Sequence, residues 1–168
     1  MIENMRDKRR PENAELRRRI DKLMEEGDVF IKQSLGHLEI SDYRYDISEA
    51  VMELSLEEEI VRQLIEDYVI QILKSKISFY KYIQELKKDI LENKPLDYTN
   101  IRNLAHKNLG VVRNLRIKDA QKLLEVIMSD DDLDYLRLCV KALEISAVKL
   151  NPLCAYETLK LIAVKNSL

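Results

Sequence analysis

The sequence predicts an all-α fold: an antiparallel up-and-down four-helix bundle with an N-terminal helical extension and a short extra C-terminal helix. The chain has 168 residues but only three glycines and three prolines, so few residues interrupt a helix. Hydrophobic residues make up 46% and charged residues 35%, a balance typical of a folded globular protein. Apolar residues recur every three or four positions over long stretches, which is the spacing of one helix face.

The first 41 residues are expected to form the N-terminal helical extension. Periodic apolar residues predict a helix over about 12–26, and Gly27 and Asp28 are expected to interrupt it. A short apolar stretch follows at 29–35, and 41–46 has the composition of a linker or turn. The bundle and the last helix are expected to occupy 42–168.

Four main helices are expected at about 55–91, 98–115, 118–128 and 131–150, followed by a last helix at 154–164. A short helix before them is expected to be capped by Asp46 or Ser48. Ser55 stands three residues before Glu58, the spacing of a capping box, and is expected to open the longest helix. Further N-terminal caps are expected at Asp97 or Thr99, and within the acidic run 130–132.

Charge and cysteine content narrow the possible partners and location. The net charge is -2, and no stretch has the eighteen or so apolar residues of a membrane span, so neither nucleic acid nor membrane is expected as a partner. Near the N-terminus, basic residues cluster at Arg6, Lys8, Arg9, Arg10, Arg17, Arg18 and Arg19. This cluster is expected to be a solvated helix start, with a weak nucleic-acid or membrane contact as the alternative. The first residues lack the apolar segment of a secretory signal. Cys139 and Cys154 are expected to be buried thiols of a cytoplasmic protein.

His106 is the most informative residue for function. At 100° per residue, it falls nearly opposite the apolar side of its helix, with Arg102, Gly110 and Arg113 around it. Because residues four apart stack on one face, Gly110 removes the side chain that would crowd the ring. An exposed imidazole over a glycine and flanked by cations can receive a bulky, negative group, such as a phosphoryl group. The expected inward residues are Ile101, Leu104, Ala105, Asn108, Val111, Val112 and Leu115.

The run 104–117 resembles the phosphoacceptor helix of histidine-containing phosphotransfer (HPt) domains. The family motif has a histidine, a glycine four positions later and a leucine nine positions later, and these match His106, Gly110 and Leu115. Residues 54–68 resemble the first bundle helix of the family, and the likeness covers roughly 46–150. The Leu-Lys pair that follows the histidine in the family is Asn108-Leu109 in this chain.

The resemblance implies a phosphorelay protein of two-component signalling. It would carry a phosphoryl group between His106 and the aspartate of a response-regulator receiver domain, with that domain or a hybrid histidine kinase as its partner. It would be a carrier without turnover of its own, with no cofactor, because the receiver supplies Mg²⁺. Arg102, Lys107 and Arg113 would stabilise the phosphoryl group. Access to the His106 ring and docking of the receiver domain would depend on Gly110, Leu109 and Asn103.

Alternatives remain open at this stage. A degenerate HPt-like module would bind a receiver or another partner without phosphotransfer. An open His106 ring, with Arg113 turned aside, would favour phosphotransfer, whereas a ring buried under Arg113 would favour binding alone. The chain is expected to be a monomer or a weak dimer with no metal site, since a helix cap explains the acidic run 130–132. His37 is expected to be structural or at the surface. Asn108 is expected to find polar partners, and its replacement by Leu to leave stability unchanged or raise it.

Overall fold

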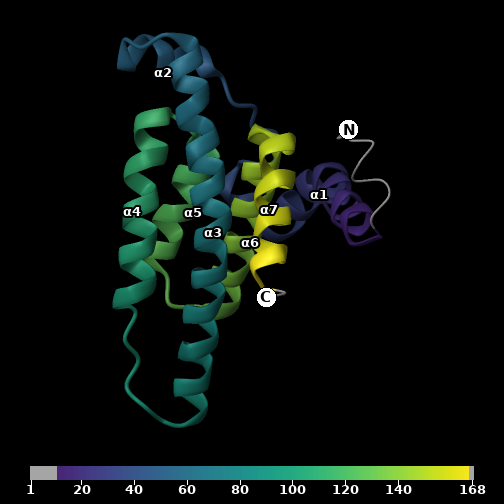
Figure 1. Ribbon diagram of the computed structural model, residues 1–168. Coiled ribbons are helices and arrows are strands. Elements are labelled where there is room, and N and C mark those ends of the chain that lie inside the picture. The colour runs from purple at the N-terminus through teal and green to yellow at the C-terminus, as the bar shows by residue number, and fades with distance from the viewer. Residues whose placement is uncertain (1–10, 167–168) are drawn as a thin grey trace.

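All regular secondary structure in the described part of the chain is helical. The computed structural model describes residues 11–166, which contain helices and no strand, as the sequence predicts (Figure 1). The elements are α1 (Pro11–Leu35), the 3-10 turn η2 (Gly36–Leu38), α2 (Ile47–Leu54), α3 (Glu58–Leu91), α4 (Thr99–Leu115), α5 (Lys118–Ser129), α6 (Leu133–Leu150) and α7 (Pro152–Asn166). Among these residues, no helix has the length and hydropathy needed to cross a membrane. The basic residues Arg6, Lys8, Arg9 and Arg10 lie outside the described residues.

Helices α3 to α6 occupy nearly the ranges expected for the four main helices. α3 packs against α4 and α6, and α5 packs against the same two helices, so the four share one apolar core. Short connections join α4 to α5 and α5 to α6 (Figure 1). The largest wholly buried side chains of these helices include Tyr68, Ile72, Leu73, Phe79, Ile101, Leu109, Leu123 and Leu124.

Aspartates cap several of the helix starts. Asp132 Oδ1 accepts hydrogen bonds from the amides of Asp134 (3.1 Å) and Tyr135 (3.2 Å) at the start of α6. Asp46 caps α2. At the start of α4 the N-cap residue is Tyr98, which makes no side-chain capping bond, so neither Asp97 nor Thr99 is the cap that the sequence predicts; Asp97 does accept from the Thr99 amide (2.9 Å). These carboxylates satisfy amides that have no partner within the helix.

The expected capping box at Ser55 is wrong. Ser55 ends α2 in a left-handed conformation, with φ 52°, and α3 begins only at Glu58. Glu57 is the N-cap residue of α3, and its side chain makes no capping hydrogen bond. The spacing of Ser55 and Glu58 is that of a capping box, but a residue that closes one helix in this backbone conformation does not cap the next.

The expected break at Gly27 and Asp28 is also wrong, because α1 runs without interruption from Pro11 to Leu35. Gly27 is buried where α1 crosses α6, and a Cβ at this position would lie 2.5 Å from Ile145 Cγ2. The glycine therefore permits close helix packing rather than a turn. The N-terminal helix packs on α6 and α7 and lies across them (Figure 1).

Charged residues join α1 to the other helices. Glu144 of α6 is buried and pairs with Lys76 of α3 and with Arg19 of α1, the latter at 3.2 Å. Asp28 of α1 pairs with Lys149 of α6 at 2.7 Å. These contacts connect the helical extension to the core of the protein.

Two tyrosines between η2 and α2 fix the turn that follows α4. Tyr45 Oη donates to the Leu115 carbonyl (2.7 Å) and Tyr43 Oη to the Arg116 carbonyl (3.2 Å). Tyr43 Oη also accepts from the Lys118 amide at the start of α5 (3.1 Å). Burial raises the pKa of Tyr45 to about 12, which further favours the protonated hydroxyl that donates this bond. The C-terminal end of the helix that carries His106 is held in place by these bonds.

Candidate functional site

His106 lies on the outer face of α4, as its helical position predicts. Ala105, Val112 and Leu115 of the same helix are buried, whereas the His106 side chain is exposed. Leu104 is half-buried at the edge of the core. No hydrogen bond or ion pair engages the exposed imidazole within residues 11–166.

Asn108 sets how α4 lies against α3. It is wholly buried, and its Oδ1 accepts a hydrogen bond from Gln71 Nε2 (3.1 Å). Its Nδ2 donates to Ser75 Oγ (3.3 Å) and to the Leu104 carbonyl (2.9 Å). The expectation that Asn108 finds polar partners is confirmed. This network couples α4 to α3 two residues from His106 and so helps to direct the ring outward.

Gly110 leaves open space beside His106. It is exposed, and a Cβ added to it would have no atom within 4 Å, apart from its immediate backbone surroundings. A glycine in a helix interior costs about 1 kcal/mol relative to alanine. Packing within the described chain does not account for this cost, unlike at Gly27. An external group that must approach the helix closely would account for it.

The arginines that flank His106 are each paired with a carboxylate. Arg113 forms an ion pair with Glu125 of α5 at 3.5 Å. Arg102 forms one with Asp131 at 2.6 Å and also lies over the Tyr98 ring. Both pairs draw the guanidinium groups toward α5 and the loop that follows it. The imidazole is therefore not covered by Arg113.

Leu109 does not lie on the exposed docking surface that the resemblance predicts for it. It is only 2% exposed and belongs to the core. The position is only 60° around the helix axis from His106, but that step turns the side chain from the open face of α4 into its packed side. The prediction of Leu109 as an exposed anchor is therefore wrong. Asn103 is exposed, as expected, and lies one turn before His106.

A groove between α3 and α4 was not foreseen from the sequence. It has a volume of about 420 Å³, and Lys107 of α4 and Lys74 of α3 both line it. Its polar lining includes Gln71, Ser75 and Ser78, which are spaced as one stripe of α3. The sequence does contain a signal for this groove. A polar stripe runs along the long helix α3, and the buried Asn108 requires polar partners of that kind.

The other reactive side chains are accounted for by structure. His37 is exposed, and its Nε2 lies 2.6 Å from Tyr135 Oη. Cys139 is buried, and burial raises the pKa of its thiol to about 12, whereas Cys154 is only partly buried. Within residues 11–166 there is no group of three or more His, Cys, Asp or Glu side chains that could hold a metal ion.

Comparisons of the chain with protein-family models, with curated proteins and with solved structures found no match. The resemblance to HPt domains therefore rests on the motif around His106 and on the surroundings of that residue. Those surroundings consist of an exposed imidazole, an open glycine one turn later, and cations on either side of the exposed face of α4.

Proposed function

We propose that this protein is a phosphocarrier of the HPt type, in which α3 to α6 form an antiparallel four-helix bundle and His106 is the phosphoacceptor. The observation that carries the proposal is the open imidazole: His106 is exposed beside the bare surface of Gly110, and Arg113 is turned toward Glu125 of α5. This arrangement favours transfer over a protein in which the ring is covered.

The proposed reaction is an in-line exchange with a docked receiver domain. A lone pair of the neutral imidazole of His106 attacks phosphorus, and a new N–P bond forms. The bond from phosphorus to the aspartyl oxygen of the receiver breaks, and the electron pair leaves with the carboxylate. The receiver brings Mg²⁺ for its own phosphoryl group. The reverse reaction passes the group to a second receiver.

The three cations near His106 would act differently. Lys107 is exposed and has no ion-pair partner within the described chain, so it is free to approach a phosphoryl oxygen. The pair of Arg113 with Glu125 is about half exposed on both sides, and such surface pairs contribute little. A phosphoryl group can therefore replace Glu125 as the partner of Arg113. Arg102 is held by both Asp131 and Tyr98 and would mainly add positive potential.

A binding module without phosphotransfer is the second candidate. The observation that favours it is Leu109, which stands where the family has a lysine and is buried in the core. One cation that the family places near the phosphoryl group is thus missing. Such a module would bind a receiver or another partner through the same face of α4.

The direct test is incubation of the purified chain with phosphorylated receiver domains from the same organism. We expect acid-labile, base-stable phosphate on the wild type and none on His106→Gln, with the fold unchanged by circular dichroism. His37→Gln is the matched control, because the chain has two histidines and His37 lies away from α4. This variant should accept phosphate as the wild type does. Absence of phosphohistidine with every receiver tried would support the binding module.

Substitution of Arg113 tests whether this arginine supports phosphotransfer to His106 or blocks access to the ring. Loss of a charge-assisted contact of about 1.5–3 kcal/mol corresponds to a rate that is roughly 10- to 150-fold lower. We therefore expect Arg113→Ala to slow phosphorylation by a factor in this range, and Glu125→Gln, which releases Arg113, to leave the rate unchanged or raise it. Faster phosphorylation of Arg113→Ala would instead mean that the arginine obstructs His106.

A further inference from the structure

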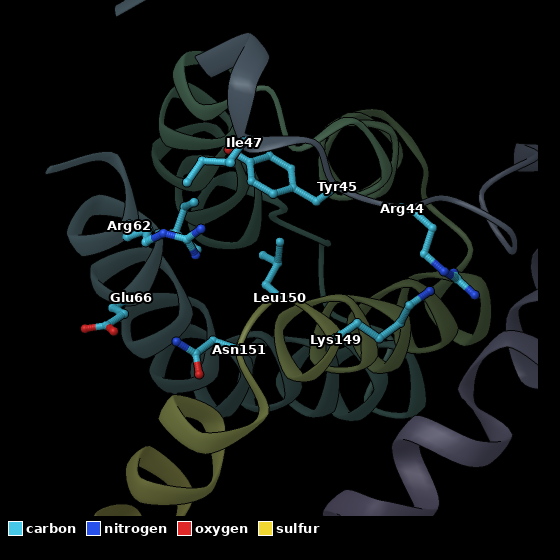
Figure 2. A pocket seen from close by; sticks show the side chains of 9 residues that line it. Arg44, Tyr45, Ile47, Arg62, Glu66, Lys149, Leu150 and Asn151 are labelled. Carbon is cyan, nitrogen blue, oxygen red and sulfur yellow. The ribbon is translucent and has the colours of Figure 1, made fainter. Parts of the chain in front are cut away.

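A second cavity lies where the N-terminal part of α3 meets the junction of α6 and α7. It has a volume of about 420 Å³, within the range of small-molecule sites. None of its lining residues belongs to α4, so it is separate from the face that carries His106. Figure 2 shows the side chains around it, which come from the segment before α2 and the first residue of α2, from α3, and from the end of α6 and the residue that follows it.

One part of the cavity wall is apolar. Ile47, Ile65 and Leu150 line it together with Tyr45, whose ring is visible beside Ile47 in Figure 2. The hydroxyl of Tyr45 is committed to the Leu115 carbonyl, so its contribution to the cavity is mainly the ring. This wall suits the hydrocarbon part of a ligand, whose burial there removes apolar surface from water.

Two hydrogen-bond donors lie beside this apolar wall. Asn151 Oδ1 accepts from the Cys154 amide at the start of α7 (3.0 Å), so the Nδ2 group is left on the other side of the amide, toward the side of α3 that carries Arg62 and Glu66 (Figure 2). The guanidinium of Arg62 extends toward Ile47 (Figure 2). Its ion pair with Glu58 at 3.1 Å is more than half exposed on both sides, and such a pair is readily exchanged.

The lining contains more cationic side chains, those of Arg44, Arg62 and Lys149, than acidic ones. Arg44 and Lys149 share the single carboxylate of Asp28, at 3.3 Å and 2.7 Å. This trio therefore carries an excess of one positive charge. Glu66 is the acidic residue of the lining, and its carboxylate points away from the cavity in Figure 2.

We propose that this cavity binds a small amphipathic organic anion, with a carboxylate or phosphate head group and a hydrocarbon body. The head group is held by the Arg62 guanidinium and the Asn151 Nδ2 group, and the body lies against Ile47, Tyr45 and Leu150. A purely apolar ligand would cover these two donors without satisfying them, which is costly. A bare inorganic anion would leave the apolar wall unused.

Titrations monitored by ¹H–¹⁵N NMR test this proposal. The probes are 2-naphthoate and octanoate, with 2-naphthalenemethanol as the neutral match and inorganic phosphate as the head group alone. We expect at least one of the two acids to shift the amides of Ile47, Ile65 and Asn151. The alcohol and phosphate should each bind about tenfold more weakly or worse, because each lacks one half of the recognised chemistry.

Two variants remove the donors while sparing the fold. Asn151→Asp keeps an oxygen that can cap α7 but replaces the Nδ2 donor with negative charge. Arg62→Gln removes the guanidinium and loses only an exposed ion pair. Each should weaken binding of the acid about tenfold or more. Lys22→Gln on α1 is the control, because Lys22 is exposed and lies 4.0 Å from Glu26. This variant should bind the acid with the same affinity as the wild type.

Several results would overturn the proposal. These are the absence of shifts with both acids, shifts confined to residues away from the cavity, or equal affinity of the acid for wild type, Arg62→Gln and Asn151→Asp. Binding of phosphate as tight as that of the acids would also overturn it, because the apolar wall would then have no role. Each of these outcomes is independent of whether His106 accepts phosphate.

Discussion

Asn108 is a buried polar residue on the helix that carries His106. Its three hydrogen bonds, to Gln71, Ser75 and the Leu104 carbonyl, use both ends of the side-chain amide. A buried amide is tolerated when its groups are satisfied, and it then specifies one arrangement of the elements that it joins. Asn108 thus acts with the buried apolar residues of α4 to fix the rotation of this helix against α3, and His106 lies on the opposite, exposed face.

The network changes the expectation for Asn108→Leu. The sequence alone predicted that this variant would be neutral or more stable, but Leu leaves Ser75 and Gln71 without their buried partner. We expect the free energy of unfolding to fall by about 1–3 kcal/mol in urea denaturation. Asn103→Leu is the matched control, because Asn103 lies on the exposed face of the same helix and should change stability by no more than about 0.5 kcal/mol. Equal stability of the two variants would contradict a structural role for the network.

In helix α1, the local sequence around Gly27 predicts a helix break, whereas the structure shows that this glycine permits close packing of two helices. In isolation, Gly27 followed by Asp28 is typical of a helix break, and the sequence predicts one there. In the folded protein, Gly27 lets α1 approach α6 so closely that Ile145 would contact any added side chain. Ion pairs on either side of the crossing, from Arg19 and Asp28, attach the same helix to α6.

The two glycines of the α1 region provide a prediction and its control. Alanine is favoured over glycine in a helix by about 1 kcal/mol, but at Gly27 its methyl group would overlap Ile145, a core side chain that has little room to move. We expect Gly27→Ala to lower the free energy of unfolding by about 1–3 kcal/mol. Gly36→Ala should stay within about 0.5 kcal/mol of the wild type, since nothing lies within 4 Å of the added methyl group. Thermal unfolding of both variants measures the difference, and a stabilised Gly27→Ala would contradict the close packing.

Local signals predicted the helices well, because periodicity and caps such as Asp132 depend on neighbouring residues in the chain. They also placed His106 on the outer face of α4. They failed where a distant residue decides the outcome. Gly27 is explained by Ile145, more than a hundred positions away. Leu109 lies on the packed side of α4, and the period of one helix does not specify how far its neighbours cover it.

For the molecule as a whole, buried ionisable side chains lie where helices pack against one another. Glu144 joins α1, α3 and α6 through Arg19 and Lys76. Asp119 lies at the start of α5 and accepts a hydrogen bond from the Ala120 amide at 2.7 Å. Burial raises the pKa of Asp119, and the Ser146 hydroxyl, the Ala120 amide and the charge of Lys149 offset this only in part. The charged form of Asp119 is therefore disfavoured in the folded protein, which makes the stability of the whole molecule depend on pH.

The sign of this dependence follows from the direction of the shift. Because the folded-state pKa of Asp119 lies above its ordinary value of 3.8, the folded protein binds the proton more tightly than the unfolded chain does. The resulting stabilisation is fully present below the ordinary value and is lost as the pH rises through the raised pKa. Asp119→Asn keeps an oxygen that can accept from Ala120 but cannot ionise. We therefore expect the free energy of unfolding of Asp119→Asn, relative to wild type, to increase from about pH 4 to about pH 7 in urea titrations. A difference that stays constant with pH, or that moves in favour of the wild type, would show that Asp119 is better stabilised as a carboxylate than its burial implies.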